Sequence, residues 1–275
     1  MTRDRTAAPA LTDAEVAEFK QQGILVLRGV LDEDEVARLV GECDRLIADP
    51  ATPSRQQQAD GTWDSIRNTI AGSHEARRLI AHPNVLPAIV RLMGTNLRII
   101  TSHLIYRNAD EAPAPGQERI PSWHRDIAHV STDLGFAHTP MLQIKAAFCL
   151  ADLAGKDSGG TVFLPGSNLF TMRPSIAPGE DPQGAVEPEL RAGDCLLFEN
   201  RTMHAGGWNL SGRVRKSLMI AYGYRWLAPA DYRRQSEEAR AQMSEVERFL
   251  VGESRAPSEE FILGGSGSPL DAYLS

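Results

Sequence analysis

The sequence predicts a mainly β domain with flanking helices, built as a β-sandwich or barrel. The middle of the chain holds several short runs of β-branched and aromatic residues, and turns rich in glycine and proline separate these runs. Runs with helical spacing of apolar residues stand before and after this middle part. A chain of 275 residues that is 42% hydrophobic can fill one large core. We therefore expect a single domain over residues 11–228, with helices packed outside its strands.

The amino-terminal part is predicted to alternate helices with one strand. Thr12 and Glu15 are spaced as a capping box at the start of a helix, and Gly23 stands where that helix should end. The further elements expected here are a strand over 24–30, a helix over 31–48 and two short helices broken at Pro83 within 74–94. Residues 1–10 are expected to form a disordered tail, and residues 49–65 a polar loop.

The strands of the middle part are short and separated by turns. They are expected over residues 96–108, 141–153 and 215–226. Two more are expected within 158–168, between two turns, and within 189–200, next to a turn at Gly193 and Asp194. A proline-rich loop over 109–121 lies among them. From residue 229 the chain becomes polar and helical in pattern. Residues 229–275 are therefore expected to form a helical extension that ends in a mobile tail rich in glycine and serine.

Composition and charge exclude several classes of protein. The formal net charge is -7, and no run of basic residues marks a surface for nucleic acid or membrane. No apolar stretch approaches the roughly 20 residues that span a bilayer, and the amino terminus lacks the apolar core of a signal peptide. The three cysteines are widely spaced and odd in number, which fits a reduced compartment. We expect a cytoplasmic protein with a small-molecule partner, and these features leave its oligomeric state open.

The segment PSWHRDIAHV, residues 121–130, contains a possible metal site. In an extended chain, residues two apart point to the same side, so His124 and Asp126 would face one point. The sequence His-Arg-Asp also occurs in the catalytic loop of protein kinases. That loop needs Asn five positions after the Asp, and Ser131 stands there. The chain also lacks a DFG motif, so the kinase interpretation is excluded. A surface ion pair remains the simpler interpretation of this motif taken alone.

A third ligand for such a site is sought among the other histidines. Those predicted on outer helices, in the loop after the motif or within a strand have weaker support, and they are His74, His82, His129, His138 and His103. His204 differs because it follows a strand and precedes two glycines, which allow close approach of the backbone. Two histidines and a carboxylate with an open coordination sphere form the facial triad of non-haem Fe(II) oxygenases. A closed structural zinc site would need a fourth protein ligand, and none is evident.

An oxygenase that uses a dicarboxylate co-substrate needs a cation for the far carboxylate. Arginine suits this role because its planar guanidinium pairs with both oxygens of a carboxylate. Arg215 begins the strand after His204, and Ser217 lies on the same face two residues on. The two side chains together would clamp a carboxylate. Taken alone, Arg215 would more often be a surface cation of a strand.

Four segments of the chain occur in an order that is specific for one known family. The segments are LTDAEVAEFKQQGILVLRGVLDEDEVARLV, SWHRD, LQIKAAFCLADLAGKDSGGTVFLPGSN and GDCLLFENRTMHAGGWNLSGRVRKSLMIAYGYRW. In the last segment an Arg follows the His by 11 positions. On these segments the chain resembles the phytanoyl-CoA dioxygenase family of Fe(II)/2-oxoglutarate-dependent oxygenases, over nearly all of residues 11–228. One departure is visible, because many relatives have Pro-Gly-Ser-His where this chain has Asn168 after Pro-Gly-Ser.

The resemblance implies a fold, a set of cofactors and roles for individual residues. The fold would be a double-stranded β-helix, a cupin-like jelly roll, and the cofactors would be Fe(II), 2-oxoglutarate and O2. The catalytic residues, which are also the iron ligands, would be His124, Asp126 and His204. Arg215 would bind the far carboxylate of 2-oxoglutarate, with help from Ser217. Polar residues on earlier strands are further candidates for contacts to 2-oxoglutarate, and they are Arg67, His103 and Lys145.

The predicted reaction is oxidation of a small metabolite or natural-product intermediate, with hydroxylation as the expected outcome and release of succinate and CO2. Related halogenases have a small residue in place of the carboxylate so that chloride can bind iron, and the presence of Asp126 therefore favours oxidation. The chain lacks a cluster of Lys and Arg for coenzyme A, so the substrate in the family's name is not expected here. Desaturation, epoxidation and ring formation are not separated from hydroxylation by sequence. Two alternatives stay open, a jelly-roll metal dioxygenase that needs no keto acid and a non-catalytic binding protein that retains the fold.

Overall fold

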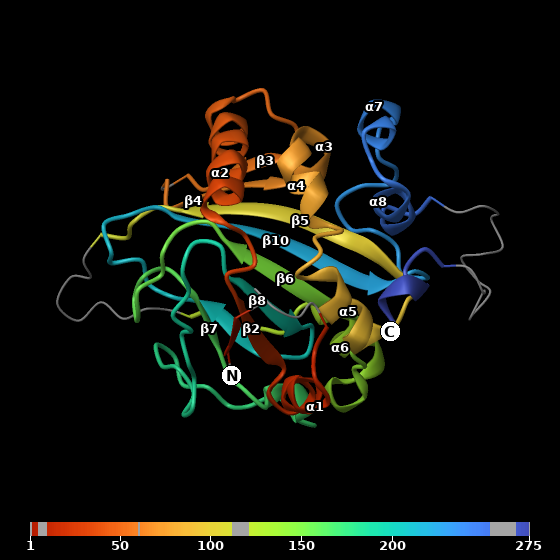
Figure 1. Cartoon of the computed structure of the whole chain (residues 1–275). Coiled ribbons are helices and arrows are strands. Elements are labelled where there is room, and N and C mark those ends of the chain that lie inside the picture. Colours follow the sequence, from red (N-terminus) through yellow and green to blue (C-terminus); the bar gives the residue numbers. More distant parts are fainter. Residues whose placement is uncertain (1, 5–9, 60, 112–120, 254–267, 275) are drawn as a thin grey trace.

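The computed structural model describes residues 2–4, 10–59, 61–111, 121–253 and 268–274 (Figure 1). Its helices in this described part are α1 Asp13–Gln22, α2 Glu33–Ala48, α3 Thr69–Gly72, α4 His74–Leu79, α5 Leu86–Met93, α6 Ala128–Leu134, α7 Glu237–Ala241 and α8 Glu245–Leu250, with the short 3-10 helices η1 Phe136–His138, η2 Ser167–Leu169 and η4 Asp271–Tyr273. Its strands are β1 Thr2–Asp4, β2 Ile24–Arg28, β3 Arg55–Gln57, β4 Trp63–Arg67, β5 Leu97–Arg107, β6 Gln143–Cys149, β7 Thr161–Phe163, β8 Cys195–Glu199, β9 His204–Gly206 and β10 Arg215–Tyr224.

One large sheet organises the molecule. Among the described residues it has eight strands in the order β1-β2-β8-β6-β10-β5-β4-β3, and β7 pairs with β9 in a separate small sheet. Neighbouring strands are antiparallel, except that β1 and β2 run parallel. Figure 1 shows α2, α3 and α4 above the long strands β5 and β10, with β7 and loops on the other side. None of the described helices is long and apolar enough to cross a membrane.

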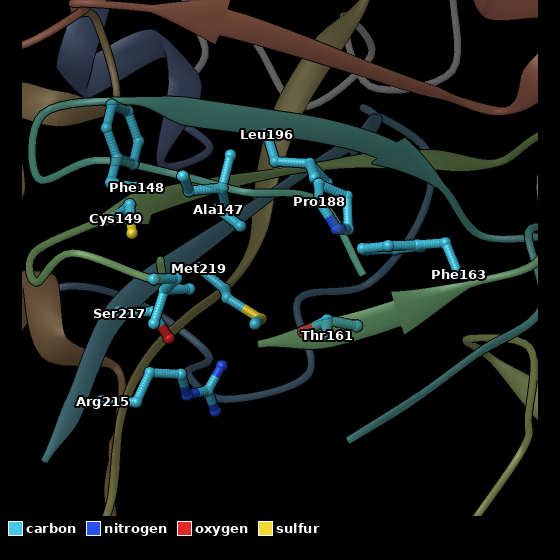
Figure 2. A pocket seen from close by; sticks show the side chains of 12 residues that line it. Ala147, Phe148, Cys149, Thr161, Phe163, Pro188, Leu196, Arg215, Ser217 and Met219 are labelled. Carbon is cyan, nitrogen blue, oxygen red and sulfur yellow. The ribbon is translucent and has the colours of Figure 1, made fainter. Parts of the chain in front are cut away.

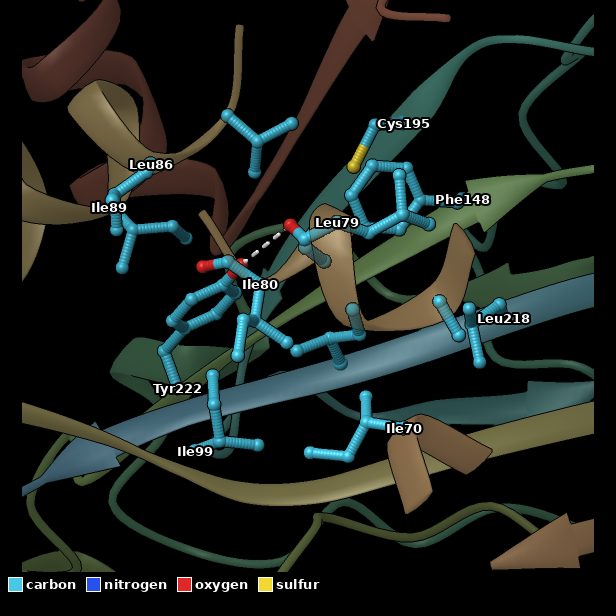
Figure 3. Packing of buried hydrophobic residues seen from close by; sticks show 14 of the residues in the cluster. Ile70, Leu79, Ile80, Leu86, Ile89, Ile99, Phe148, Cys195, Leu218 and Tyr222 are labelled. Atoms are coloured by element: carbon cyan, nitrogen blue, oxygen red, sulfur yellow. Dashed lines mark hydrogen bonds between the residues drawn. The ribbon is translucent and has the colours of Figure 1, made fainter. Parts of the chain in front are cut away.

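The face of the sheet toward the helices carries the main hydrophobic core. Leu218, Ile220 and Tyr222 alternate along β10, and all three are fully buried. The hydroxyl of Tyr222 donates to the backbone oxygens of Leu79 and Ile80 at 3.3 and 3.1 Å, which ties β10 to the end of α4 (Figure 3). Full burial of each large apolar side chain stabilises the fold by roughly 1.5–3 kcal/mol. This face therefore holds the sheet and helices together and leaves the other face for polar groups.

The opposite face of the same strands gathers polar side chains from several strands. Because strand side chains alternate between faces, Arg215, Ser217 and Met219 point away from the helix side of β10. His103 of β5 pairs with Met219 and so lies on the same face. Lys145 of β6 pairs with the residue two positions after Met219, which places it on this face too. The register of three strands thus brings together residues that are distant in sequence.

Most predicted elements are confirmed, and one difference lies at an edge of the sheet. The capping box of α1 is formed by Thr12 and Glu15, and the expected helices α4 and α5 and the five strands of the middle part are all present. The segment 49–65, expected as a loop, instead contains β3 and the start of β4, which form an antiparallel pair. An ion pair of 2.7 Å between Arg55 and Asp64 joins these two strands. A polar edge strand lacks the apolar alternation on which the prediction relied.

The two ends of the described chain also differ from the expectation. Thr2–Asp4, part of the expected tail over 1–10, pairs with β2 as a strand. The helical extension is present as α7 and α8. Leu270, in the expected mobile tail, is fully buried in the main core, which corrects that expectation for residues 268–274. Residues 254–267 of the same tail lie outside the described residues.

Candidate metal centre

Two imidazoles and one carboxylate meet in one place. His124 and Asp126 come from the segment before α6, and His204 begins β9. Their ligand atoms all lie within 4.8 Å of one another, a grouping that could hold a metal ion. The backbones of His124 and His204 form an isolated antiparallel bridge, and their ring centroids are 4.3 Å apart. The grouping therefore depends on a pairing between distant parts of the chain.

Backbone carbonyls orient both imidazoles. Nδ1 of His124 lies 2.7 Å from the oxygen of Ser122, and Nδ1 of His204 lies 2.9 Å from the oxygen of Thr202. A carbonyl oxygen only accepts, so each Nδ1 carries the hydrogen and each Nε2 keeps its lone pair. Such hydrogen bonds orient a coordinating ring and raise the basicity of its other nitrogen. Both rings are thus in the tautomer that binds a metal through Nε2.

Hydrogen bonds to neighbouring residues stabilise the turn that carries His204. Thr202 donates its hydroxyl to the oxygen of Gly23 at 2.9 Å and its N–H to the oxygen of Glu199 at 3.1 Å. Gly23 has φ +74°, and a Cβ there would lie 2.2 Å from the Thr202 hydroxyl oxygen, so only glycine fits. Asn168 donates from Nδ2 to the buried carboxylate of Glu199 at 2.9 Å. Asn168, which stands where many relatives have the His of Pro-Gly-Ser-His, therefore supports this turn and does not contact the three candidate ligands.

The electrostatics of the site favour an ionised Asp126 and a neutral His204. Burial alone would raise the pKa of Asp126, but the ammonium of Lys145, 2.8 Å away, and the neighbouring imidazoles hold it below its ordinary value. Burial lowers the pKa of His204 to about 4. A carboxylate and a neutral imidazole are the forms that coordinate metals. Both groups therefore have the protonation state needed for coordination at neutral pH.

A small cavity lies beside this site, on the polar face of the sheet. β10 contributes Arg215, Ser217 and Met219, whose side chains stand next to one another in Figure 2. Phe163 of β7 also lines the cavity, and its ring centroid is 5.8 Å from that of His204. The rest of the lining is mostly apolar and comes from β6 and the loop after it, from the start of β7, and from β8 and the segment before it. The cavity thus joins the surroundings of a candidate ligand to a buried arginine.

Arg215 is buried, and none of the described carboxylates pairs with it at contact distance. It is 8% exposed, its Nε has no hydrogen-bond partner, and the described part of the chain places no carboxylate within 4.0 Å of its guanidinium. Burial and the charge of Arg107 lower its pKa to about 10, so it is still a cation at neutral pH. The hydroxyl of Ser217 is also buried, with no hydrogen-bond partner among the described residues. A buried unpaired charge is strongly unfavourable, so this end of the cavity favours an anionic group such as a carboxylate.

His103 and Arg67 extend the polar face across two further strands. They pair directly across β5 and β4. His103 is 9% exposed, and its Nε2 finds no hydrogen-bond partner in the part of the chain that the structure describes. Its ring meets that of Trp63 edge-on at 5.9 Å between centroids. Burial and the charges of Arg67, Lys145 and Arg215 lower the pKa of His103 to about 3, which keeps it neutral. The donor set and these unpartnered polar atoms together fit a divalent metal ion with a dicarboxylate beside it.

The structure separates the remaining histidines from the site. His74 lies on α4 with half of its side chain exposed, as expected. The expectation that His82 is solvated is wrong, because His82 is only 6% exposed and packs beside α2. His129 lies on α6 and His138 in η1, where a loop was expected. None of these four belongs to the grouping formed by the three candidate ligands.

Sequence reasoning missed two residues near the site. Thr161 lines the cavity with Arg215 and carries a hydroxyl there. Arg125 stands between the two candidate ligands of the motif and is buried. The alternation that places His124 and Asp126 on one side also places Arg125 on the other, and this was the signal that could have found it. No comparable signal marked Thr161, because its place depends on how β7 packs against the large sheet.

The sequence of the chain is similar to those of known proteins. The sequence matches the phytanoyl-CoA dioxygenase family over residues 19–217. Ectoine dioxygenase from Bordetella bronchiseptica is 22% identical over 247 residues, which cover 78% of this chain and 76% of that protein.

Two solved structures from nogalamycin biosynthesis are similar as well. The epimerase SnoN, solved in complex with Fe3+, alpha-ketoglutarate and nogalamycin RO, is 27% identical with a TM-score of 0.59, covering 78% of this chain and 83% of that chain. The alpha-ketoglutarate-dependent carbocyclase SnoK is 20% identical with a TM-score of 0.61, covering 86% of this chain and 94% of that chain. These likenesses confirm the predicted fold class, a jelly roll with flanking helices.

Proposed function

The chain belongs to the phytanoyl-CoA dioxygenase family, and from this premise we propose that His124, Asp126 and His204 bind its iron. The protein is an Fe(II)/2-oxoglutarate-dependent oxygenase, an oxidoreductase with O2 as its oxidant. The observation that carries the ligand assignment is the approach of the three sets of ligand atoms to within 4.8 Å of one another. These three residues would hold the ion and would leave it accessible to a chelating co-substrate and O2.

The far carboxylate of 2-oxoglutarate is assigned to Arg215 and Ser217. Both side chains are buried in the cavity beside the triad, and both have polar atoms without a partner. A carboxylate would neutralise the guanidinium and accept from the hydroxyl at the same time. Lys145, His103 and Arg67 complete the proposed co-substrate site, in which Lys145 stands next to Asp126 and the other two lie on neighbouring strands.

The chain's own residues orient the metal ligands and the co-substrate and exclude water from the site. Bound iron, with 2-oxoglutarate as reductant that leaves as succinate and CO2, supplies the activation of O2. Phe163 and Phe198 pack against the ring of His204, with centroid distances of 5.8 and 5.0 Å, and exclude water from that side. Lys145 keeps Asp126 ionised, so that the carboxylate can coordinate. Arg215 orients the co-substrate along the cavity.

The proposed substrate is a small metabolite or natural-product intermediate, and the proposed outcome is hydroxylation. SnoN, which is similar over most of the chain, is an epimerase from nogalamycin biosynthesis. The carboxylate of Asp126 occupies the position that halogenation would need free. A cytoplasmic location is part of the proposal and is supported by Cys43, Cys149 and Cys195, which are all buried and form no disulfide in the described part of the chain.

An anaerobic titration tests the proposal. Fe(II)-loaded protein is titrated with 2-oxoglutarate, and a weak visible charge-transfer band should grow to saturation. Exposure to O2 should then yield succinate, measured by mass spectrometry, and a panel of candidate substrates should be screened for a gain of 16 mass units, one oxygen atom. Iron binding without the band or succinate would favour a dioxygenase that needs no keto acid. Failure to bind any metal would favour a binding protein that retains the fold.

A further inference from the structure

Arg125 stands between the two ligands of the H-x-D motif, and its side chain binds elsewhere. It is 5% exposed. Its Nη1 donates to the backbone oxygen of Phe136 at 3.2 Å, and its Nη2 donates to the oxygens of Ser167 and Phe170 at 2.7 and 3.1 Å. Its guanidinium carbon also lies 3.6 Å from the centroid of the Phe136 ring. One side chain thus joins the ligand segment to η1 and to both ends of η2.

These contacts hold Arg125 firmly. The described part of the chain places no carboxylate within 4.0 Å of its guanidinium, so its direct partners there are carbonyl dipoles and an aromatic ring. Hydrogen bonds to a charged group are among the stronger ones in proteins, and a cation over a ring adds to them. A movement of the side chain would leave a buried cation without partners. The backbone at Arg125 is therefore tightly constrained.

The residues on either side of Arg125 are constrained as well. His124 is bridged to His204 through the backbone. Ile127 has φ +51°, in the left-handed region that a β-branched residue rarely adopts. Such strain persists only where the surrounding contacts impose it. Asp126 therefore lies between a bridged residue, an anchored residue and a strained residue.

We propose that Arg125 is a positioning residue that fixes the direction in which Asp126 presents its carboxylate to the metal ion. This inference rests on the proposed function, because it presupposes that Asp126 is a ligand. Arg125 does not reach the ligand atoms, so it acts through the backbone that it anchors. Metal sites require ligand positions to within about 0.5 Å, so a small shift of this backbone weakens the site.

Arg225 provides a matched control elsewhere in the chain. It is 2% exposed, and its guanidinium donates to the backbone oxygens of Phe249 and Glu253, each at 2.7 Å. Its guanidinium carbon lies 4.1 Å from the centroid of the Phe249 ring. Arg225 thus has the same kind of surroundings as Arg125, but it joins β10 to the end of α8 and has no metal ligand beside it.

The test compares Co(II) binding and thermal stability of Arg125→Met, Arg125→Gln, Arg125→Lys and Arg225→Met. Co(II) is added anaerobically, and its visible bands report both affinity and ligand geometry. Arg125→Met should bind Co(II) about 10–100-fold more weakly, the range typical for residues that orient ligands, with altered bands. Arg125→Lys should recover part of the affinity, because an ammonium can still donate to the carbonyls. Arg225→Met should lower the Tm while its Co(II) affinity and bands stay those of the wild type.

The possible outcomes distinguish a positioning role of Arg125 from a purely structural role. Unchanged Co(II) affinity and bands in Arg125→Met, with a Tm lowered as in Arg225→Met, would reduce Arg125 to a structural role. If Arg125→Met does not fold, Arg125→Gln takes its place, and wild-type binding in that variant overturns the inference equally. A wild-type protein that fails to bind Co(II) would instead contradict the proposed function itself.

Discussion

His124 and His204 exchange two backbone hydrogen bonds, each 3.0 Å from nitrogen to oxygen. In both residues the ring Nδ1 also bonds to the carbonyl of the residue two positions earlier, Ser122 in one and Thr202 in the other. The same local arrangement thus occurs twice, and the bridge sets the two copies side by side. The backbone alone therefore determines where both Nε2 atoms point, which is the preorganisation that a metal site requires.

Removal of either imidazole should abolish metal binding. His124→Ala and His204→Ala should each weaken Fe(II) or Co(II) binding by more than ~100-fold, because only two of the three ligands would remain. Losing a ligand should lower the metal affinity more than losing a residue that only orients a ligand. Equilibrium dialysis with metal analysis measures this. His74→Ala, at an exposed position on α4, serves as the control and should bind one ion like the wild type. A full equivalent of tightly bound metal in His204→Ala would remove His204 from the ligand set.

Loss of the Arg215 charge should act on 2-oxoglutarate and leave iron in place. Arg215→Met should weaken 2-oxoglutarate binding by roughly 2–5 kcal/mol, the range for truncating one partner of a buried hydrogen-bonded charge pair. This corresponds to about 30-fold to 4,000-fold in Kd. Titration of the visible band measures it, with the exposed Arg213→Met as control. Ser217→Ala should have a smaller effect in the same direction, and unchanged co-substrate affinity in Arg215→Met would contradict the assignment.

The stability of the protein should fall between pH 7 and pH 5, partly because of His103. Its pKa in the folded protein is about 3, below the ordinary value of 6.5, so the unfolded chain takes up a proton first as the pH falls. Stability attributable to this residue is therefore lost from about pH 6.5 downward, by about 2 kcal/mol at pH 5. The free energy of unfolding of His103→Gln, measured with urea, should therefore fall by about 2 kcal/mol less between pH 7 and pH 5 than that of the wild type. Between pH 7 and pH 8 the stability difference between the two proteins should stay constant.

Two glycines should respond to alanine in opposite directions. Gly23→Ala should lower the free energy of unfolding by roughly 2–5 kcal/mol, because it combines a left-handed backbone with a clash against Thr202. Gly41 lies inside α2, where an added Cβ meets nothing within 4 Å. Gly41→Ala should therefore raise the free energy of unfolding by about 0.5–1 kcal/mol. Denaturant unfolding of both variants checks the pair, and an equal effect in both would show that the contact with Thr202 is unimportant.

Local patterns predicted most of the secondary structure. The capping box of Thr12 with Glu15 and the apolar alternation of β10 are determined by neighbouring residues, so they are visible in the sequence. The hairpin of β3 and β4 was missed because a polar edge strand has no such alternation. The burial of Leu270 was missed because a Gly/Ser-rich segment has no period that indicates a contact with the core.

The residue types of the site were determined by the sequence itself: two histidines, one carboxylate and a following arginine in an order typical of one family. Only the tertiary structure decided which face of the sheet is polar and that the bridge between His124 and His204 sets both rings in register. It also decided that Arg215 is buried with no carboxylate of the described residues within 4.0 Å of its guanidinium. The physical reason is that spacing along a strand determines on which side neighbours lie. Burial and charge compensation depend on which distant strands pack against that side.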